Sequence, residues 1–191
     1  MTDAAPQTCT AFAGDTIIAR GTPRDVAPAV KAASEAGEAV LVFDDADARL
    51  VEFDLRGDLE AVLARLAPPP VAPKGPGRPK LGVTAREVTL LPRHWDWLSA
   101  QPGGASVALR KLVEGALREA EGPDRVRRGR EAAYRFMTAM AGDRPGYEDA
   151  VRALFAGDAA GLEAAMAGWP EGVRSFAGLA RAADPDYRVA V

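Results

Sequence analysis

The spacing of apolar residues in the first third of the chain predicts a repeated order of strand, strand and helix. Residues 8–12 and 16–20 are short runs of β-prone side chains, and the Ala-Gly-Asp between them predicts a hairpin. A helix is expected next, because Thr22 or Asp25 can cap it and Pro23 suits its first turn. Its apolar face is formed by Val26, Ala29, Val30 and Ala33.

The same order then repeats. An apolar strand is expected over residues 40–43, followed by an aspartate-rich turn and an alternating strand over residues 50–54. Asp58 can open a second helix, whose apolar residues are Leu59, Val62, Leu63 and Leu66. Four strands backed on one face by two helices make a compact unit. The fold class is therefore expected to be α+β, with a (ββα)2 module over residues 1–67.

Residues 68–83 are rich in proline, glycine and basic side chains. Proline runs favour an extended polyproline conformation, and they cannot supply a packed core. We therefore expect an interdomain linker that joins the N-terminal module to the rest of the chain.

Residues 84–121 predict a strand, a helix, a tight turn and a second helix. Val88 and Leu90 alternate with other side chains, which is the period of a strand with one buried face. Pro92 ends this strand and suits the first turn of a short helix that runs to Ala100. A Pro-Gly-Gly turn ends that helix.

The second helix of this segment carries one continuous apolar stripe. Ser106 can cap it, and Gly122-Pro123 is expected to end it near Glu121. The stripe consists of Leu109, Leu112, Val113, Ala116 and Leu117. A lone strand needs a partner, and a second copy related by a two-fold axis supplies an identical one. The segment therefore predicts a homodimer.

The run from Gly103 to Val113, with its glycine turn, capping serine and apolar spacing, resembles the ribbon-helix-helix family of bacterial DNA-binding proteins, relatives of the Arc and MetJ repressors. The resemblance covers about 35 of the 191 residues. It implies that paired strands from two copies enter the major groove, with Glu87, Thr89 and Leu91 facing the bases. A carboxylate can accept a hydrogen bond from cytosine but is repelled by phosphates, so the resemblance implies modest base specificity.

The end of the linker, from Lys74 to Lys80, resembles the AT-hook, which has a Gly-Arg-Pro core between basic residues. The resemblance implies an arm in a narrow A·T minor groove, where Arg78 would meet enhanced negative potential. A plain linker is the alternative.

The complete chain also resembles an uncharacterised bacterial family that is defined only as a domain of unknown function, which implies no activity.

Residues 122–191 predict an all-α region. A helix is expected to start at Asp124 with a basic run and to continue with an apolar face. Three more short helices are expected over residues 147–156, 161–167 and 173–183. The expected core of this region is Phe155, Leu162, Met166, Trp169, Phe176 and Leu179.

The net charge of −3 is unevenly distributed along the chain. Residues 1–73 contain 6 Lys/Arg and 12 Asp/Glu, residues 74–130 contain 12 and 6, and residues 131–191 contain 6 and 9. A basic centre between acidic ends is typical of a chain whose middle faces a polyanion. An ordinary solvated helix surface is the alternative interpretation.

Few residues carry the chemistry that enzymes use. Cys9, the single cysteine, lies in an expected strand, which favours a buried, inert thiol. His94 is the single histidine, so a site with several histidine ligands is excluded and only carboxylates remain as other general bases. The aspartates between residues 44 and 58 lack the glycine and terminal glutamate of a calcium loop, and turn and cap roles explain them. We expect no enzyme, no cofactor and no metal site.

A cytoplasmic location is also expected. No stretch approaches the ~20 consecutive apolar residues of a membrane-spanning helix. The first residues of the chain lack the basic and apolar blocks of a secretory signal.

The sequence favours a dimeric DNA-binding protein, a transcriptional regulator or an architectural factor, held mainly by phosphate and minor-groove contacts. In the competing hypothesis the ribbon-helix-helix unit only dimerises, and the acidic ends bind a protein partner, as an antitoxin or adaptor would. Glu87 and Leu91 favour that alternative, and a small-molecule sensor is a third possibility. The residues expected to contact double-stranded DNA are Lys74, Arg78, Lys80, Arg86, Glu87, Thr89, Arg93, Gly104, Ser106, Arg110 and Lys111.

Overall fold

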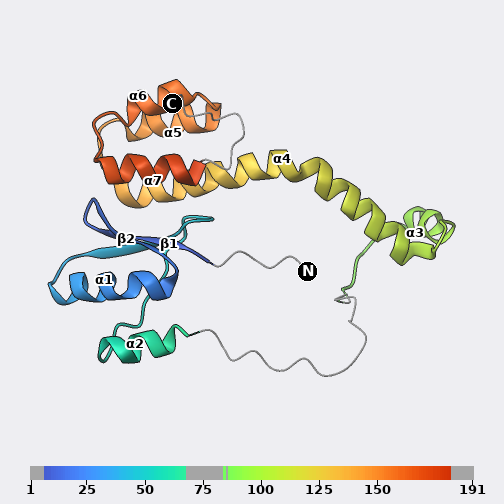
Figure 1. Cartoon of the computed structure of the whole chain (residues 1–191). Coiled ribbons are helices and arrows are strands. Elements are labelled where there is room, and N and C mark those ends of the chain that lie inside the picture. Colours follow the sequence, from blue (N-terminus) through green and yellow to red (C-terminus); the bar gives the residue numbers. More distant parts are fainter. Residues whose placement is uncertain (1–6, 68–83, 85, 182–191) are drawn as a thin grey trace. The chain divides into compact units, whose positions relative to one another are not determined.

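The computed structural model describes residues 7–67, 84 and 86–181 (Figure 1). The chain divides into two compact units. The larger unit combines Met1–Pro68 with Gly122–Val191, and the smaller unit is Pro69–Glu121. The α+β fold class is confirmed, since the described residues contain a three-stranded antiparallel sheet and seven helices.

The sheet of the larger unit is built around its first strand. The strands are β1 (Cys9–Ala13), β2 (Thr16–Gly21) and β3 (Val40–Asp44), in the order β2-β1-β3 with antiparallel neighbours. The predicted hairpin of β1 and β2 is confirmed, with a shift in register after Ala11. All five residues of β1 are buried, because it is the central strand and both faces of the sheet are covered.

Helix α1 (Pro23–Glu35) covers one face of the sheet (Figure 1). Its start is fixed by a capping box, in which the Thr22 side chain accepts from the backbone of Asp25 and the Asp25 carboxylate accepts from the backbone of Thr22. Both predicted capping residues are therefore used. The core on this face is formed by Cys9, Ala11, Val26, Val30 and Val42. Helix α2 (Leu59–Arg65), capped by Asp58 as expected, packs on α1.

The opposite face of the sheet is covered by helices from the C-terminal part of the chain. Phe12 and Phe43 from the strands meet Phe136 of α4 (Gly104–Ala141) and Phe176 of α7 (Glu171–Arg181). Ring centroids in this cluster lie 4.4 Å (Phe136 to Phe176) to 5.9 Å apart. Helices α5 (Tyr147–Ala156) and α6 (Ala159–Ala165) pack against each other and complete this core.

The prediction of a four-stranded (ββα)2 module is wrong. Residues 50–54 form no strand; Leu50 makes one isolated bridge to Phe43, and the Val51 amide donates to the Val42 carbonyl over 2.8 Å. The segment is held instead by its side chains, because Val51 and Phe53 pack against the core on the α1 face. Only α1 covers the sheet on that side, while α2 lies beyond it.

The predicted helix break at Gly122-Pro123 is also wrong, since α4 continues from Gly104 to Ala141 with Pro123 in its interior. Proline removes one amide hydrogen bond and normally kinks or ends a helix. Here the following turns are fixed by tertiary packing, because Ala132, Ala133, Phe136 and Met137 are all buried. Burial of this face outweighs the local preference of the proline.

The sequence-based division treated residues 1–67 and 122–191 as separate domains. The structure groups them in one unit, because the phenylalanine cluster joins both parts of the chain. Two cation contacts add to this connection: Arg144 Nη2 lies 2.5 Å from Asp15 Oδ1, and Arg135 donates to the Asp47 carbonyl. The smaller unit ends at Glu121, inside α4.

The short helices of the C-terminal part largely agree with the sequence. Helix α5 has the predicted bounds, and α6 and α7 begin two residues earlier than expected. Of the expected core residues, Leu162, Met166, Trp169 and Phe176 are buried, whereas Phe155 is half exposed and the side chain of Leu179 lies outside the described part. Among the described helices, none is long and apolar enough to cross a membrane.

Candidate nucleic-acid interface

The smaller unit is a pair of helices preceded by an irregular segment. Helix α3 (Pro92–Ser99) starts at the predicted proline, and its last turn closes on Ala100. Gly103 has φ +86°, and a Cβ there would lie 3.1 Å from the Val107 side chain. A larger residue would therefore be strained in both backbone and packing, which explains the glycine turn between the two helices.

Helix α4 begins at Gly104, two residues before the predicted cap. Ser106 is consequently inside the first turn, and its carbonyl accepts a hydrogen bond from Arg110 Nε over 3.1 Å. The expected capping role of Ser106 is wrong. The first turn of any helix still presents backbone N–H groups without partners inside the helix, at the positive end of its dipole.

The strand expected before Pro92 does not form in this single chain. The described residues 84 and 86–91 have no regular secondary structure, although Leu91 has the extended dihedral angles φ −67° and ψ 150°. A strand needs a hydrogen-bonded neighbour, and no described segment of the chain pairs with these residues. The base-facing positions of the family resemblance, Glu87 and Thr89, are exposed.

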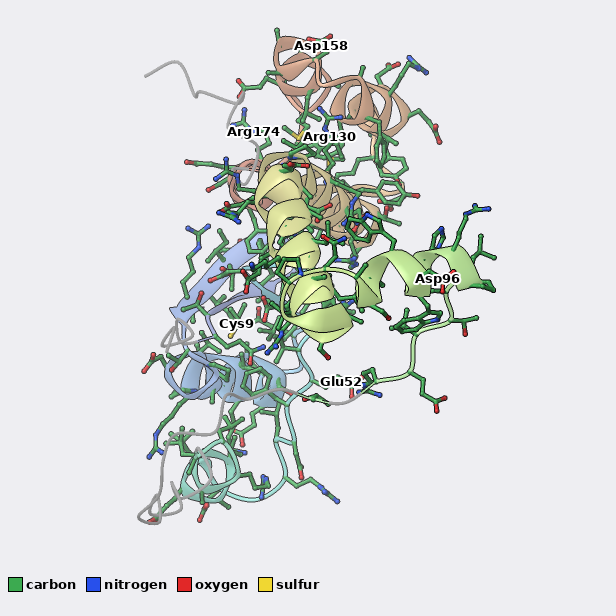
Figure 2. The ribbon with its side chains drawn as sticks, turned by 90° about the vertical axis from the view of Figure 1, so that its right-hand side faces the viewer. Cys9, Glu52, Asp96, Arg130, Asp158 and Arg174 are labelled. Carbon is green, nitrogen blue, oxygen red and sulfur yellow. The ribbon has the colours of Figure 1, made fainter. Side chains whose placement is uncertain are left out.

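The smaller unit has very little core of its own. Within its described residues, Leu98 and Ala108 are the buried side chains. The apolar stripe of α4 is open to solvent, with exposed fractions of 52% for Leu112, 54% for Val113 and 63% for Leu117. Asp96 of α3 is likewise exposed (Figure 2).

An open apolar groove of about 380 Å³ lies between the two helices of this unit. Its lining is formed by Leu90, Arg93, His94, Trp97, Leu98, Leu109 and Leu112. Trp95 and Trp97 of α3 are both exposed, and Leu98 is the buried side chain of this helix. The position of Trp97 beside this groove was missed, although its spacing of three residues from His94 could have indicated a shared face.

The basic side chains of the smaller unit carry charge that no described carboxylate neutralises. Arg86, Arg93, Arg110 and Lys111 are exposed and make no ion pair with any described residue. Elsewhere in the chain, exposed arginines commonly pair, as Arg152 does with Asp149 at 2.7 Å. The other predicted contacts, Lys74, Arg78 and Lys80, lie outside the described residues.

The aspartates considered as a possible metal site have structural partners instead. Asp44 and Asp47 accept from backbone amides in their own turn, and Asp58 caps α2. Asp54 binds the Arg56 guanidinium with both oxygens, and these hydrogen bonds hold the pKa of Asp54 well below its usual range. Among the described residues, no group of three or more His, Cys, Asp or Glu side chains could hold a metal ion.

A family model described as "Uncharacterized protein conserved in bacteria (DUF2239)" matches residues 8–180. The chain belongs to this family. No curated protein and no solved structure matches it.

Proposed function

We propose that this member of the DUF2239 family is a dimeric DNA-binding protein in which two copies of residues 84–121 form the DNA-facing unit. The exposed apolar stripe of α4 carries the proposal. Leu112, Val113 and Leu117 are each more than half exposed, on a unit whose own described core is two side chains. A contiguous exposed apolar patch usually marks an interaction site.

A second copy of the same chain is the partner that fits this unit. The backbone of residues 86–91, before α3, pairs with no described segment, and a two-fold axis would place an identical segment beside it as an antiparallel ribbon. The same axis brings two α4 stripes together. One partner then satisfies both the unpaired backbone and the exposed apolar face.

The exposed basic side chains support binding of the dimeric unit to the phosphates of DNA. Arg93, Arg110 and Lys111 are exposed and without ion pairs among the described residues, so their charge is available to phosphates. The first turn of α4 adds backbone N–H groups, which favour an anion at that end of the helix. These contacts position the protein on a duplex without reading its sequence.

The AT-hook-like arm is proposed to add a minor-groove contact. Arg78 would read the width of the groove, with Lys74 and Lys80 beside the phosphates. Deleting residues 74–80 should therefore weaken binding to A·T-rich duplexes more than to G·C-rich ones, as measured by competition between the two. An equal loss of affinity for A·T-rich and G·C-rich duplexes would mean that the arm is only a charged linker.

The experiment that tests the proposed function measures affinity for duplex DNA at several salt concentrations by fluorescence anisotropy. The logarithm of the association constant should fall steeply with the logarithm of salt, at about 0.9 per phosphate neutralised. Arg110→Ala combined with Lys111→Ala should make that slope shallower. A confirmed dimer with no duplex binding even at about 50 mM salt would refute DNA binding.

A dimer that does not bind duplex DNA would favour a second function, in which the smaller unit only dimerises and the chain binds another protein. The observation behind this alternative is that Leu91 is 49% exposed and Glu87 is exposed at positions where the family resemblance expects base contacts. An apolar side chain and a carboxylate suit a protein interface better than a phosphate-rich groove.

A further inference from the structure

We propose that the larger unit has a DNA-backbone contact of its own, formed by Arg125 and Arg128 of α4. The inference rests on the proposed function, because it assigns a second part of the chain to the same duplex. It extends the expected contacts beyond residues 74–111.

Arg125 and Arg128 differ from Arg127 of the same helix in their ion pairing. Both are exposed, and neither makes an ion pair with a described residue. Arg127, which lies between them, is engaged on both sides: its Nη2 lies 3.1 Å from Asp124 and its Nη1 lies 3.1 Å from Glu131. Arg125 and Arg128 are therefore two cations that no described carboxylate pairs with on this turn of the helix.

The neighbouring carboxylates do not neutralise this pair. Asp124 and Glu131 are held by Arg127, and Arg128 Nε donates to the backbone carbonyl of Asp124 over 3.2 Å rather than to its carboxylate. Glu121 is exposed and forms no ion pair with Arg125, although the two residues are four positions apart. The charge of both guanidinium groups is therefore open to a ligand.

The geometry of the helix suits a phosphate backbone. Residues three apart are neighbours on a helix surface, so the two guanidinium groups can bind adjacent phosphates. Gly122 lies three residues before Arg125, and a Cβ added there would meet no atom within 4 Å. The surface beside Arg125 is thus open. Guanidinium groups match phosphate oxygens with two parallel hydrogen bonds, which favours arginine at such a contact.

The test uses the full-length chain with Arg125→Ala and Arg128→Ala combined. Both positions are exposed, so folding and dimerisation should be unchanged, which circular dichroism and light scattering can verify. At about 100 mM salt the affinity for a duplex should fall at least about tenfold, and the salt slope should become shallower by up to about four for a dimer, at about 0.9 per phosphate. The paired change Arg125→Lys and Arg128→Lys keeps the charge and should retain most of the slope.

The matched control removes the same charge from paired arginines, through Arg49→Ala combined with Arg152→Ala. Both side chains are exposed and bound to Asp47 and Asp149, so this variant should keep the wild-type slope. If the control lowers the slope as much as the test variant, net charge rather than a defined contact is responsible and the inference fails. If wild-type protein binds DNA and the Arg125/Arg128 variant has an unchanged slope, the inference fails while the proposed function stands. Absence of wild-type binding overturns both.

Discussion

The ring of Phe43, at the end of the sheet's edge strand β3, meets the ring of Phe136 in α4 edge-on, with centroids 4.9 Å apart and an interplanar angle of 76°. Both side chains are fully buried. Edge-to-face pairs at this separation are favourable beyond the area that they bury. This contact joins the N-terminal strands to the C-terminal helices, so each part completes the core of the other.

Removal of the Phe136 ring should therefore destabilise the whole larger unit. Phe136→Ala is expected to cost about 3–5 kcal/mol of unfolding free energy, because it leaves a cavity against three other rings. Urea unfolding followed by circular dichroism measures this change. Tyr134→Ala, on the same helix but 41% exposed, is the control and should cost much less. Equal costs for the two variants would contradict the shared core.

A fragment of residues 7–67 should not fold by itself. Phe12 and Phe43 are completely buried in the chain, and Phe136 and Phe176, which cover them, are missing from the fragment. Exposure of that sheet face removes much of the hydrophobic stabilisation on which a small unit depends. The amide spectrum of the fragment should show little dispersion. Cooperative thermal unfolding of the fragment would show that the N-terminal part is an independent domain after all.

Leu112→Asp should abolish the proposed dimer without unfolding the chain. Leu112 is 52% exposed in a single copy, so a carboxylate there is tolerated in the monomer but would be buried and unpaired between two copies. Light scattering at micromolar concentration should show a dimer for wild type and a monomer for the variant. Ala139→Asp, at an exposed position of the same helix, should remain dimeric. A wild-type monomer would refute the assembly.

Cys9 should resist thiol reagents in the folded protein. The residue is fully buried on the α1 side of the sheet (Figure 2), and this burial, together with Asp45, Asp44 and Asp25, raises the pKa of its thiol from 9.0 to about 11. Iodoacetamide at pH 8 should label it only after unfolding. Rapid labelling of native protein would mean that β1 opens easily.

The same pKa shift has a consequence for stability at alkaline pH. An unfolded chain loses the thiol proton near pH 9, whereas the folded chain keeps it until about pH 11. The contribution of the Cys9 thiol to the free energy of unfolding is fully present below pH 9 and is lost as the pH rises toward 11. Cys9→Ala should lack that part of the alkaline loss, as thermal unfolding at pH 8 and pH 10.5 can show.

Local patterns in the sequence predicted most of the individual elements. The Thr22 capping box, the Asp58 cap, the Pro92 helix start and the bounds of α5 all follow from residues close to one another in the chain. Such features depend on backbone hydrogen bonding within a few residues. The sequence also indicated an apolar stripe in the second helix of the smaller unit, where the candidate interface lies.

The errors arose where distant residues outweighed local preferences. Gly122-Pro123 predicts a break, but burial of Phe136 and its neighbours continues α4 through it. Residues 50–54 alternate like a strand, yet the side chains of this segment pack against the α1 face and its backbone makes a single bridge. The secondary structure of both segments depends on which apolar surface is available to bury their side chains. That surface is formed by residues distant in the sequence.

The charges of the candidate interface also depend partly on the local sequence and partly on the tertiary structure. The sequence by itself determined that the middle of the chain is basic and that its helices carry apolar faces. Only the tertiary structure decided which of those charges are neutralised, because Arg127 lies between two carboxylates while Arg125 and Arg128 pair with no described carboxylate. It also decided that Leu112 and Leu117 stay exposed, since the described residues of the smaller unit include only two buried side chains, Leu98 and Ala108. Burial and ion pairing depend on three-dimensional neighbours, whereas caps and periodicity depend on neighbours in the chain.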